Sequence, residues 1–326
     1  MTLTQLKYLI SVCECGTFAA AAEQLHVSQP TLSAQIKKLE LSAGYALLDR
    51  SRSPLSPSPE GIEYVKQARA VMQEVARLES LREHESPDVS GVVSIGVIPT
   101  VAHYMYLPLL QGLKCEYPKL TVSIHELPTN VLIERLEAGN LDMALVAGPL
   151  THHRLQETLL YFEPFVVLAN ASQALQAQNI EMSRLQDLDL LMLGEEHCLR
   201  DQTLKLCQRQ PSPKPAKSMF ECASVATIQA LVRADIAAAL LPALCIDDIQ
   251  SQSQYRNQSQ SGIVQADVPC VLQFSDPVPA RAIGLVAHKN YFKFRTLEAV
   301  RQIVLAQVPK SYLQVEDFHV VGIDHG

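Results

Sequence analysis

Two cysteines, Cys198 and Cys207, are the side chains of this sequence best suited to redox chemistry. They lie in a segment where apolar residues recur at a roughly helical spacing. At ~1.5 Å rise and ~100° of rotation per residue, a helix would hold them ~13 Å apart on opposite faces. A disulfide needs Cα atoms within about 7 Å, so the two thiols can join only if the helix comes apart. The spacing therefore predicts a thiol-based conformational switch.

The elements that must position these thiols lie beyond residue 91, where strand-like and helical patterns alternate. Strands are expected at 92–99, 120–127 and 141–148, with helices at 104–115 and 130–138. This βαβαβ order predicts a parallel sheet with right-handed crossovers. A second set has strands at 159–170, 189–194, 217–221 and 236–241 and helices at 199–207 and 224–234, followed by a strand at 282–288 and a helix at 294–307. Two such halves joined by crossing strands make a cleft, as in periplasmic binding proteins.

Polar side chains gather where these strands are expected to end. Ligands of open α/β sheets bind beyond the carboxyl ends of the strands. The residues at those ends include Thr100, His125, Thr129 and Cys198. Each of them alone is more often a loop or core residue than part of a site. Together, two hydroxyls, an imidazole and a thiol predict a binding site.

The first sixty residues have the pattern of a DNA-reading hairpin. A helical spacing begins at Leu3 and ends at Gly16, and a second short helix is expected over 18–25. Ser28 is a good N-cap for a third helix, with Pro30 in its first turn. Helix, tight turn and helix is the arrangement that reads DNA, although an ordinary three-helix bundle has the same spacing. The exposed face of the third helix offers side chains that can reach bases or phosphates, namely Gln29, Thr31, Ser33, Lys37 and Lys38.

A wing and a long helix are expected next. The stretch 51–59 is rich in proline and poorly suited to a β ladder, while Arg50 and Arg52 are candidate phosphate contacts. Over 60–83, apolar residues at three- and four-residue steps predict a coiled-coil seam of about three heptads. A helix packed on its own domain is the alternative. Residues 86–91 indicate a hinge.

Composition sets the remaining limits. The chain has 326 residues and 48% apolar residues, enough for two or three folded domains. The longest apolar run is shorter than the ~18 residues of a membrane span, which predicts a cytoplasmic protein with no membrane partner. A net charge of −7 argues against a protein that coats nucleic acid. Eight scattered cysteines suit free thiols in a reducing compartment, and their spacing indicates no metal site.

The segment Phe18–Glu40, with Leu47–Arg50 and Pro59–Gly61 after it, resembles the winged helix-turn-helix of LysR-type transcriptional regulators. The resemblance implies an α/β protein with a winged helix-turn-helix at 1–59, a dimerising linker at 60–90, a two-subdomain periplasmic-binding-protein-like effector domain at 91–308 and a tail at 309–326. It further implies a transcription activator and not an enzyme, acting as a dimer or tetramer with RNA polymerase. The DNA-binding residues would be Ser28, Gln29, Pro30, Thr31, Ser33, Lys37, Arg50 and Arg52.

The effector part is similar to the peroxide-sensing members of this family. The similar stretches include Ile95–Val101, His125–Glu126 with Thr129, and His197–Gln202 with Cys207. This resemblance implies that hydrogen peroxide oxidises Cys198, that Cys207 completes a disulfide, and that Thr100 and Thr129 hold the peroxide with His125 close by. Glutathione or a thioredoxin-fold protein would reduce the disulfide, and no cofactor is implied.

The neighbours of Cys198 are expected to ionise its thiol, because peroxide attacks the thiolate. A position at a helix N-terminus favours the anion, as do Arg200 two residues on and the adjacent His197. Asp201 is a third candidate, with Arg200 and His197, for a residue that supports the redox site around Cys198. The chain also departs from the peroxide sensors, since Met219 replaces a histidine, Cys222 and Cys245 are added, and 251–261 is a Gln/Ser-rich insertion expected to form a loop.

Three functions remain open on the sequence alone. The first is a peroxide-sensing regulator of oxidative-stress genes. The second keeps the DNA-binding architecture, but its effector is a small organic anion held in the cleft by Thr100, Thr129 and His125. The third is a thiol peroxidase that uses Cys198, which the ninety residues devoted to DNA reading and dimerisation disfavour.

Overall fold

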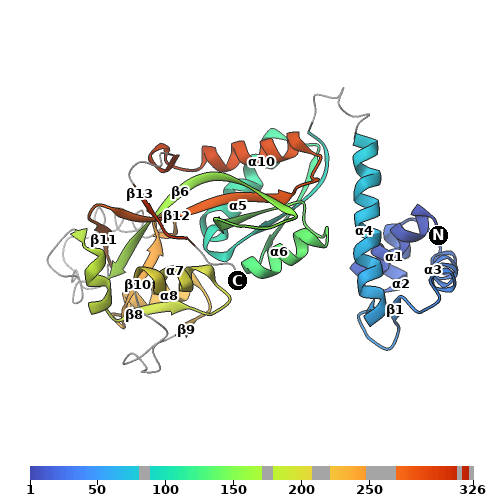
Figure 1. Cartoon of the computed structure of the whole chain (residues 1–326), viewed down its shortest axis with the longest axis horizontal. Coiled ribbons are helices and arrows are strands. Elements are labelled where there is room, and N and C mark those ends of the chain that lie inside the picture. Colours follow the sequence, from blue (N-terminus) through green and yellow to red (C-terminus); the bar gives the residue numbers. More distant parts are fainter. Residues whose placement is uncertain (81–88, 171–178, 208–220, 247–268, 314–317, 323–326) are drawn as a thin grey trace, which may run out of the picture. The chain divides into compact units, whose positions relative to one another are not determined.

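The computed structural model describes residues 1–80, 89–170, 179–207, 221–246, 269–313 and 318–322 (Figure 1). The chain divides into two compact units, of which the first consists mainly of residues 1–87 and the second of residues 88–137 and 141–326. The expected hinge at 86–91 lies partly outside the described residues, and Met219 and the insertion at 251–261 lie wholly outside them. Each unit is described separately.

The amino-terminal unit contains the three expected helices, which are α1 (Leu3–Cys15), α2 (Phe18–Gln24) and α3 (Gln29–Ala43). Hydroxyl side chains start all three, since Thr2, Thr17 and Ser28 each accept a backbone N–H of the first turn. Gly16 and Gly44 end α1 and α3 in the left-handed region, with φ of 69° and 87°, where a residue without a Cβ is favoured. The helix boundaries predicted from the sequence are therefore confirmed.

The wing is present as a minimal hairpin, in keeping with the expectation that its prolines suit a β ladder poorly. β1 (Leu48–Asp49) and β2 (Ser56–Pro57) pair antiparallel through only two residues each. So short a ladder needs few backbone donors, which is why proline is tolerated in it.

The long helix α4 (Pro59–Ser80) packs partly on its own unit. Val65 and Ala68 are buried in the same apolar core as Leu6 and Leu9 of α1. The expectation that this stripe would be free for a coiled coil is therefore wrong at Val65 and Ala68, whereas Ile62 of the same stripe is exposed. The apolar side chains that α4 does expose include Val71 and Leu78, seven residues apart on one face.

The carboxyl-terminal unit begins with the predicted βαβαβ arrangement. Its strands are β3 (Gly91–Val97), β4 (Leu120–Glu126) and β5 (Met143–Gly148), and its helices are α5 (Pro99–Glu116) and α6 (Thr129–Glu137). β3 lies between β4 and β5 and pairs in parallel with both. The parallel sheet expected from the alternating pattern is thus confirmed.

Two long antiparallel strands, β6 (Leu155–Ala169) and β12 (Val278–His288), join the two halves of this unit (Figure 1). The sheet runs in the order β4-β3-β5-β12-β6-β10-β8-β9. The second half adds β7 (Asn179–Ile180), η2 (Met182–Asp187), β8 (Leu190–Leu193), α7 (Cys198–Leu206), β9 (Glu221–Cys222), α8 (Val225–Arg233), β10 (Ala238–Pro242), η3 (Ala243–Ile246) and β11 (Cys270–Phe274). Of the strand predicted at 217–221, only its last residue belongs to β9, and 217–220 lie outside the described residues.

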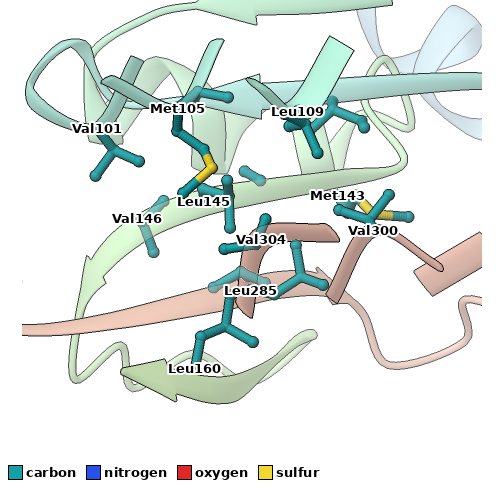
Figure 2. Close-up of a cluster of buried hydrophobic side chains, with 14 of the residues drawn as sticks. Val101, Met105, Leu109, Met143, Leu145, Val146, Leu160, Leu285, Val300 and Val304 are labelled. Atoms are coloured by element: carbon teal, nitrogen blue, oxygen red, sulfur yellow. The ribbon is translucent and has the colours of Figure 1, made fainter. Parts of the chain in front are cut away.

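Each half of the unit has its own apolar core. In the first half, Met105 and Leu109 of α5 meet Leu145 of β5, Leu285 of β12 and Val304 of α10 (Phe294–Ala306) (Figure 2). The second core gathers residues of β6, β8, β10 and α8 around α7. These cores fix the ends of β3, β4 and β8, beyond which the candidate site lies.

The residues after α10 do not form a separate tail. η5 (Lys310–Leu313) and β13 (Phe318–Val320) belong to the same compact unit, and β13 pairs in parallel with the start of β12. Among the described residues, no helix is both long and apolar enough to cross a membrane.

Candidate functional site

Three helix N-termini meet the candidate site, and each carries one of the predicted side chains. Thr100 lies in the first turn of α5, Thr129 begins α6, and Cys198 begins α7. The strands that precede these helices end at Val97, Glu126 and Leu193, so the residues follow the carboxyl ends of strands, as predicted.

Cys198 belongs to the second half of the unit but packs against the core of the first half. The residue as a whole is partly exposed, and it forms no disulfide among the described residues. Burial raises the pKa of this thiol above its ordinary value, although Arg281 and the Thr129 hydroxyl oppose the effect. Both opposing groups come from the first half or the crossing strands, so the site is assembled from both halves.

The Thr129 hydroxyl is buried beside this thiol and has no hydrogen-bond partner among the residues that the structure describes. It lies near enough to lower the pKa of Cys198, but the two groups do not have the geometry of a hydrogen bond. A buried hydroxyl without a partner costs about 1–3 kcal/mol. The position is therefore one where a small polar molecule would be stabilised.

A buried ion pair supports the Thr100 hydroxyl. Arg281 of β12 and Glu163 of β6 are both fully buried, with Arg281 Nε and Nη2 donating to Glu163 Oε2 at 2.9 and 2.8 Å. Arg281 Nη1 donates to Thr100 Oγ1 at 2.7 Å. Because this oxygen already accepts a bond, the hydroxyl proton of Thr100 is available to another acceptor.

The same pair is held by further buried groups. The backbone N–H of Leu244 donates to Glu163 Oε1 at 3.2 Å, and the Tyr104 hydroxyl donates to Glu163 Oε2 at 3.1 Å and lies 2.6 Å from the Tyr161 hydroxyl. The nearby Glu163 carboxylate raises the pKa of the Arg281 guanidinium, whereas burial raises the pKa of Glu163. Since arginine keeps its proton throughout the working range, we take the pair to be charged.

Cys207 lies at the other end of α7 and in the other core. It is the C-cap residue of the helix, with its N–H donating to Thr203 O at 3.0 Å. Its thiol is buried in the second core, while Cys198 packs against the first. The structure thus has the two thiols on different sides of an intact helix, as the spacing predicted.

The candidate DNA interface is the exposed face of α3. Gln29, Pro30, Thr31 and Lys37 are exposed, and Ser33 is half-buried. Ser28 Oγ lies 2.7 Å from Thr31 Oγ1 and accepts the N–H of Thr31, so it has a capping role. The arginines of the wing are exposed but paired, Arg50 with Glu40 at 2.8 Å and Arg52 with Asp49 at 3.1 Å.

Comparisons with known proteins agree with both parts of the structure. The model of the "Bacterial regulatory helix-turn-helix protein, lysR family" matches residues 3–62, and that of the "LysR substrate binding domain" matches residues 87–309. The chain belongs to the LysR family. It is therefore a transcription regulator that binds DNA through its helix-turn-helix, and not an enzyme.

Relatives within the LysR family are named as peroxide regulators. The chain is 33% identical over 287 residues to the "Hydrogen peroxide-inducible genes activator" of Pectobacterium carotovorum, covering 88% of this chain and 90% of the relative. It is also 33% identical to OxyR of Escherichia coli K12, covering 88% and 89%.

Solved structures of OxyR proteins have the same fold. A full-length OxyR mutant from Pseudomonas aeruginosa matches with a TM-score of 0.78 at 30% identity, covering 94% of this chain and 98% of that one. A Corynebacterium glutamicum OxyR mutant with hydrogen peroxide bound matches with a TM-score of 0.57 at 28% identity, covering 94% of each chain. These matches show that the chain is a LysR-family regulator related to the OxyR peroxide sensors.

In this LysR-family chain the cation beside Cys198 is not the expected Arg200, whereas the backbone N–H at the start of α7 does lower the pKa of the thiol. Arg200 forms ion pairs with Glu221 and Glu195, and Asp201 raises the pKa of Cys198. His197 occupies the N-cap position of α7 without a capping hydrogen bond from its side chain, and it is buried, with Nε2 3.6 Å from Glu196 Oε1. The cation that lowers the pKa of the thiol is Arg281, yet burial outweighs it, so the net shift is upward.

Three buried residues of the site were not predicted from the sequence. Arg281 and Glu163 each interrupt a long apolar strand, and a charged residue in such a run is the signal that could have revealed a buried pair. Gln202 lies one turn after Cys198 on α7, is fully buried, and has both amide atoms unpaired among the described residues. His125, by contrast, is half-buried on β4 opposite Gly96, and the structure describes no hydrogen bond from its imidazole.

The added cysteines lie in buried surroundings. Cys222 lies in the second core, and the Cys245 thiol donates to the backbone oxygen of Thr100 at 3.1 Å. No cluster of three or more potential metal ligands occurs in the part of the chain that the structure describes.

Proposed function

We propose that this LysR-family regulator senses hydrogen peroxide through Cys198 and controls oxidative-stress genes, acting in the cytoplasm as an activator. The observation that carries the proposal is the Thr129 hydroxyl, which is buried beside the Cys198 thiol and has no hydrogen-bond partner within the described part of the chain. The relatives named for hydrogen peroxide support it. Cys198→Ser, which should abolish the response, is the central test and is argued in the Discussion.

The chemistry begins with the Cys198 thiolate attacking one oxygen of hydrogen peroxide. The O–O bond breaks, an S–O bond forms, and the leaving hydroxide takes a proton to become water, so that Cys198 becomes a sulfenic acid. The Cys207 thiol then attacks this sulfur, and a second water leaves as the disulfide forms. A glutathione or thioredoxin-fold reductant returns both residues to thiols.

The proposed peroxide position is the space between Thr129, Thr100 and Gln202. Hydrogen peroxide both donates and accepts hydrogen bonds, so it can satisfy the Thr129 hydroxyl and the two free amide atoms of Gln202. The available proton of Thr100 can stabilise charge on the leaving oxygen, an interaction that strengthens in the transition state. We retain His125 as a further polar group of this site.

Disulfide formation requires α7 to change shape. Over the nine residue steps from Cys198 to Cys207 the helix rises ~13 Å, whereas a disulfide needs Cα atoms within about 7 Å. The Cys207 side chain must also leave the second core, in which it is buried. We infer that refolding of α7 is the switch that changes the assembly of the DNA-reading units.

The proposed partners are double-stranded DNA, RNA polymerase and further copies of this chain. The exposed Val71 and Leu78 of α4 supply an apolar face for a dimer, and two dimers would make a tetramer. A dimer suits a DNA site with two-fold symmetry, whose half-sites would each receive one α3 helix.

The organic-anion alternative has one observation in its favour. A cavity of about 230 Å³ adjoins the start of α7 and is lined by His197, His103, Glu126 and Ser224 among others. However, Thr100, Thr129 and His125, which were expected to hold the anion, do not line it, and the carboxylate of Glu126 would repel an anion. Calorimetric titration of the chain with a panel of small carboxylates would favour this alternative if one of them bound tightly.

The reaction of Cys198 with peroxide should accelerate with pH. Burial raises the pKa of this thiol, so the thiolate is the minor form at neutral pH and its fraction rises with pH up to that pKa. We expect the rate constant of oxidation to rise about tenfold per pH unit between about pH 6 and 8, without a plateau. Rapid mixing with peroxide, followed by trapping of the remaining thiol and mass spectrometry of the Cys198 peptide, measures this rate. A plateau in this range would show instead that the thiolate already dominates at neutral pH.

Two variants of α3 should distinguish contacts to DNA bases from contacts to DNA phosphates. Gln29 is exposed at the start of α3, so Gln29→Ala leaves the fold intact and should reduce discrimination between DNA sequences by about 1–3 kcal/mol. Lys37→Ala should instead weaken binding to all sequences and lower the salt dependence by about one unit. Fluorescence anisotropy with DNA selected from a random pool by the wild-type protein, and with its scrambled version, measures both effects. Equal losses on both DNAs for Gln29→Ala would contradict base reading by this residue.

A further inference from the structure

The last described residues of the chain add a strand beside the buried ion pair. β13 (Phe318–Val320) pairs with Val278–Ala280 of β12, and the N–H of Val321 donates to Ala280 O at 2.8 Å. Ala280 immediately precedes Arg281, the cation that lowers the pKa of Cys198. These residues lie beyond residue 309, where the family match ends. We call residues 318–322 the C-terminal clasp.

Apolar contacts fix the clasp in the carboxyl-terminal unit. Phe318 and Val320 pack against the buried Phe162, Ala280 and Ala282, and the Phe318 ring stacks on that of Phe162 with centroids 6.5 Å apart. Val321 is buried in the second core, to which Leu199 and Cys207 also belong. The clasp therefore shares an apolar core with both ends of α7.

A direct bond joins the clasp to α7. Lys205 Nζ donates to Gly322 O at 3.0 Å, across 117 positions of sequence. Lys205 lies in the last turn of α7, two residues before Cys207. A cation at this end also favours the helix through its dipole. The clasp thus holds the end of α7 that carries Cys207, which must move if the two cysteines are to meet.

We propose that the C-terminal clasp stabilises the helical form of α7 and so sets how readily the Cys198–Cys207 disulfide forms. The second half of this inference rests on the proposed peroxide function. The contacts of Lys205 and Val321 exist only while the last turn of α7 keeps its place, so refolding of α7 must break them. Their loss opposes the disulfide, and removing them in advance favours it.

Two variants of the full chain test the clasp. One ends at residue 317, and the other is Lys205→Met, which keeps the aliphatic stem but loses the bond to Gly322. Lys114→Met is the matched control, because Lys114 is an exposed lysine near the end of another helix, α5. The first measurement is hydrogen exchange of the α7 amides in the thiol form. The second is the thiol–disulfide equilibrium of Cys198 and Cys207 in glutathione buffers.

In both variants the α7 amides should exchange hydrogen faster than in the wild type, and the thiol–disulfide equilibrium of Cys198 and Cys207 should shift toward the disulfide. The expected shift is about fivefold for Lys205→Met, corresponding to the net contribution of one ordinary hydrogen bond, because the bond to Gly322 is exposed to solvent; the truncation should give a larger shift. Lys114→Met should match the wild type. If the truncated chain loses its fold, Lys205→Met decides the result by itself.

The proposal would be overturned if the α7 amides of Lys205→Met exchanged at the wild-type rate. It would also be overturned if the thiol–disulfide equilibrium of this variant were the same as in the wild type. The exchange measurement uses the thiol form and needs no peroxide. Failure of the wild-type cysteines to pair would therefore overturn the proposed function, whereas unchanged exchange in Lys205→Met would overturn the clasp alone.

Discussion

Cys198→Ser is expected to abolish the peroxide response completely while DNA binding is retained. A serine hydroxyl is not oxidised by peroxide, so neither the sulfenic acid nor the disulfide can form. DNA binding is retained because the helix-turn-helix lies in the other compact unit, with its own core. The measurements are transcription from a responsive promoter before and after peroxide, and anisotropy with the same DNA.

Two further variants make this result specific. Cys115→Ser changes an exposed thiol on α5 and should respond like the wild type. Cys207→Ser should stop at the sulfenic acid, which dimedone labels on Cys198 and mass spectrometry detects. A Cys198→Ser protein that still switches on peroxide would falsify the proposed function, and a response lost in Cys115→Ser would point to a different thiol.

Arg281→Met is expected to lower the free energy of unfolding by about 3–5 kcal/mol, because it leaves the Glu163 carboxylate buried without its partner. Both members of this pair are fully buried, and Arg281 makes two of the bonds that Glu163 accepts. Loss of the cation should also raise the pKa of Cys198 further and slow its oxidation at neutral pH. Chemical unfolding followed by circular dichroism measures the stability, and thiol trapping measures the rate.

The double variant Arg281→Met/Glu163→Gln separates the charge from the packing. Its neutral amide can still accept the N–H of Leu244, so much of the stability should return, while the slow oxidation should remain. Arg301→Met, which breaks an exposed pair with Glu298 on α10, should cost less than about 1 kcal/mol. If Arg281→Met were no more destabilising than Arg301→Met, the buried pair would not have the proposed structural role.

Local patterns were sufficient for the helices and most strands. Capping residues such as Ser28, and glycines such as Gly16 that adopt positive φ, act within one turn of chain, so their effect can be read from neighbouring residues. The parallel order of β3, β4 and β5 also followed, because alternating strands and helices leave few ways to form a sheet.

Predictions that depended on distant partners were less successful. The apolar stripe of α4 was expected to face another chain, but Val65 and Ala68 pack on α1 of the same unit. The residues after 308 were expected to be a tail, but β13 pairs with β12. The sequence of an apolar or extended segment predicts that the segment will be buried or paired, but it does not specify which other segment or chain will be its partner.

The sequence by itself determined the two thiols, their separation along one helix, and the hydroxyls of Thr100 and Thr129 beyond the ends of strands. Only the tertiary structure decided the electrostatics around Cys198, because a charge acts through distance in space and the screening of its surroundings. Arg200 is two residues away in sequence but pairs with Glu221 and Glu195, whereas Arg281 comes from a remote strand and lowers the pKa of the thiol. The same folding back of the chain brings Gly322 to Lys205.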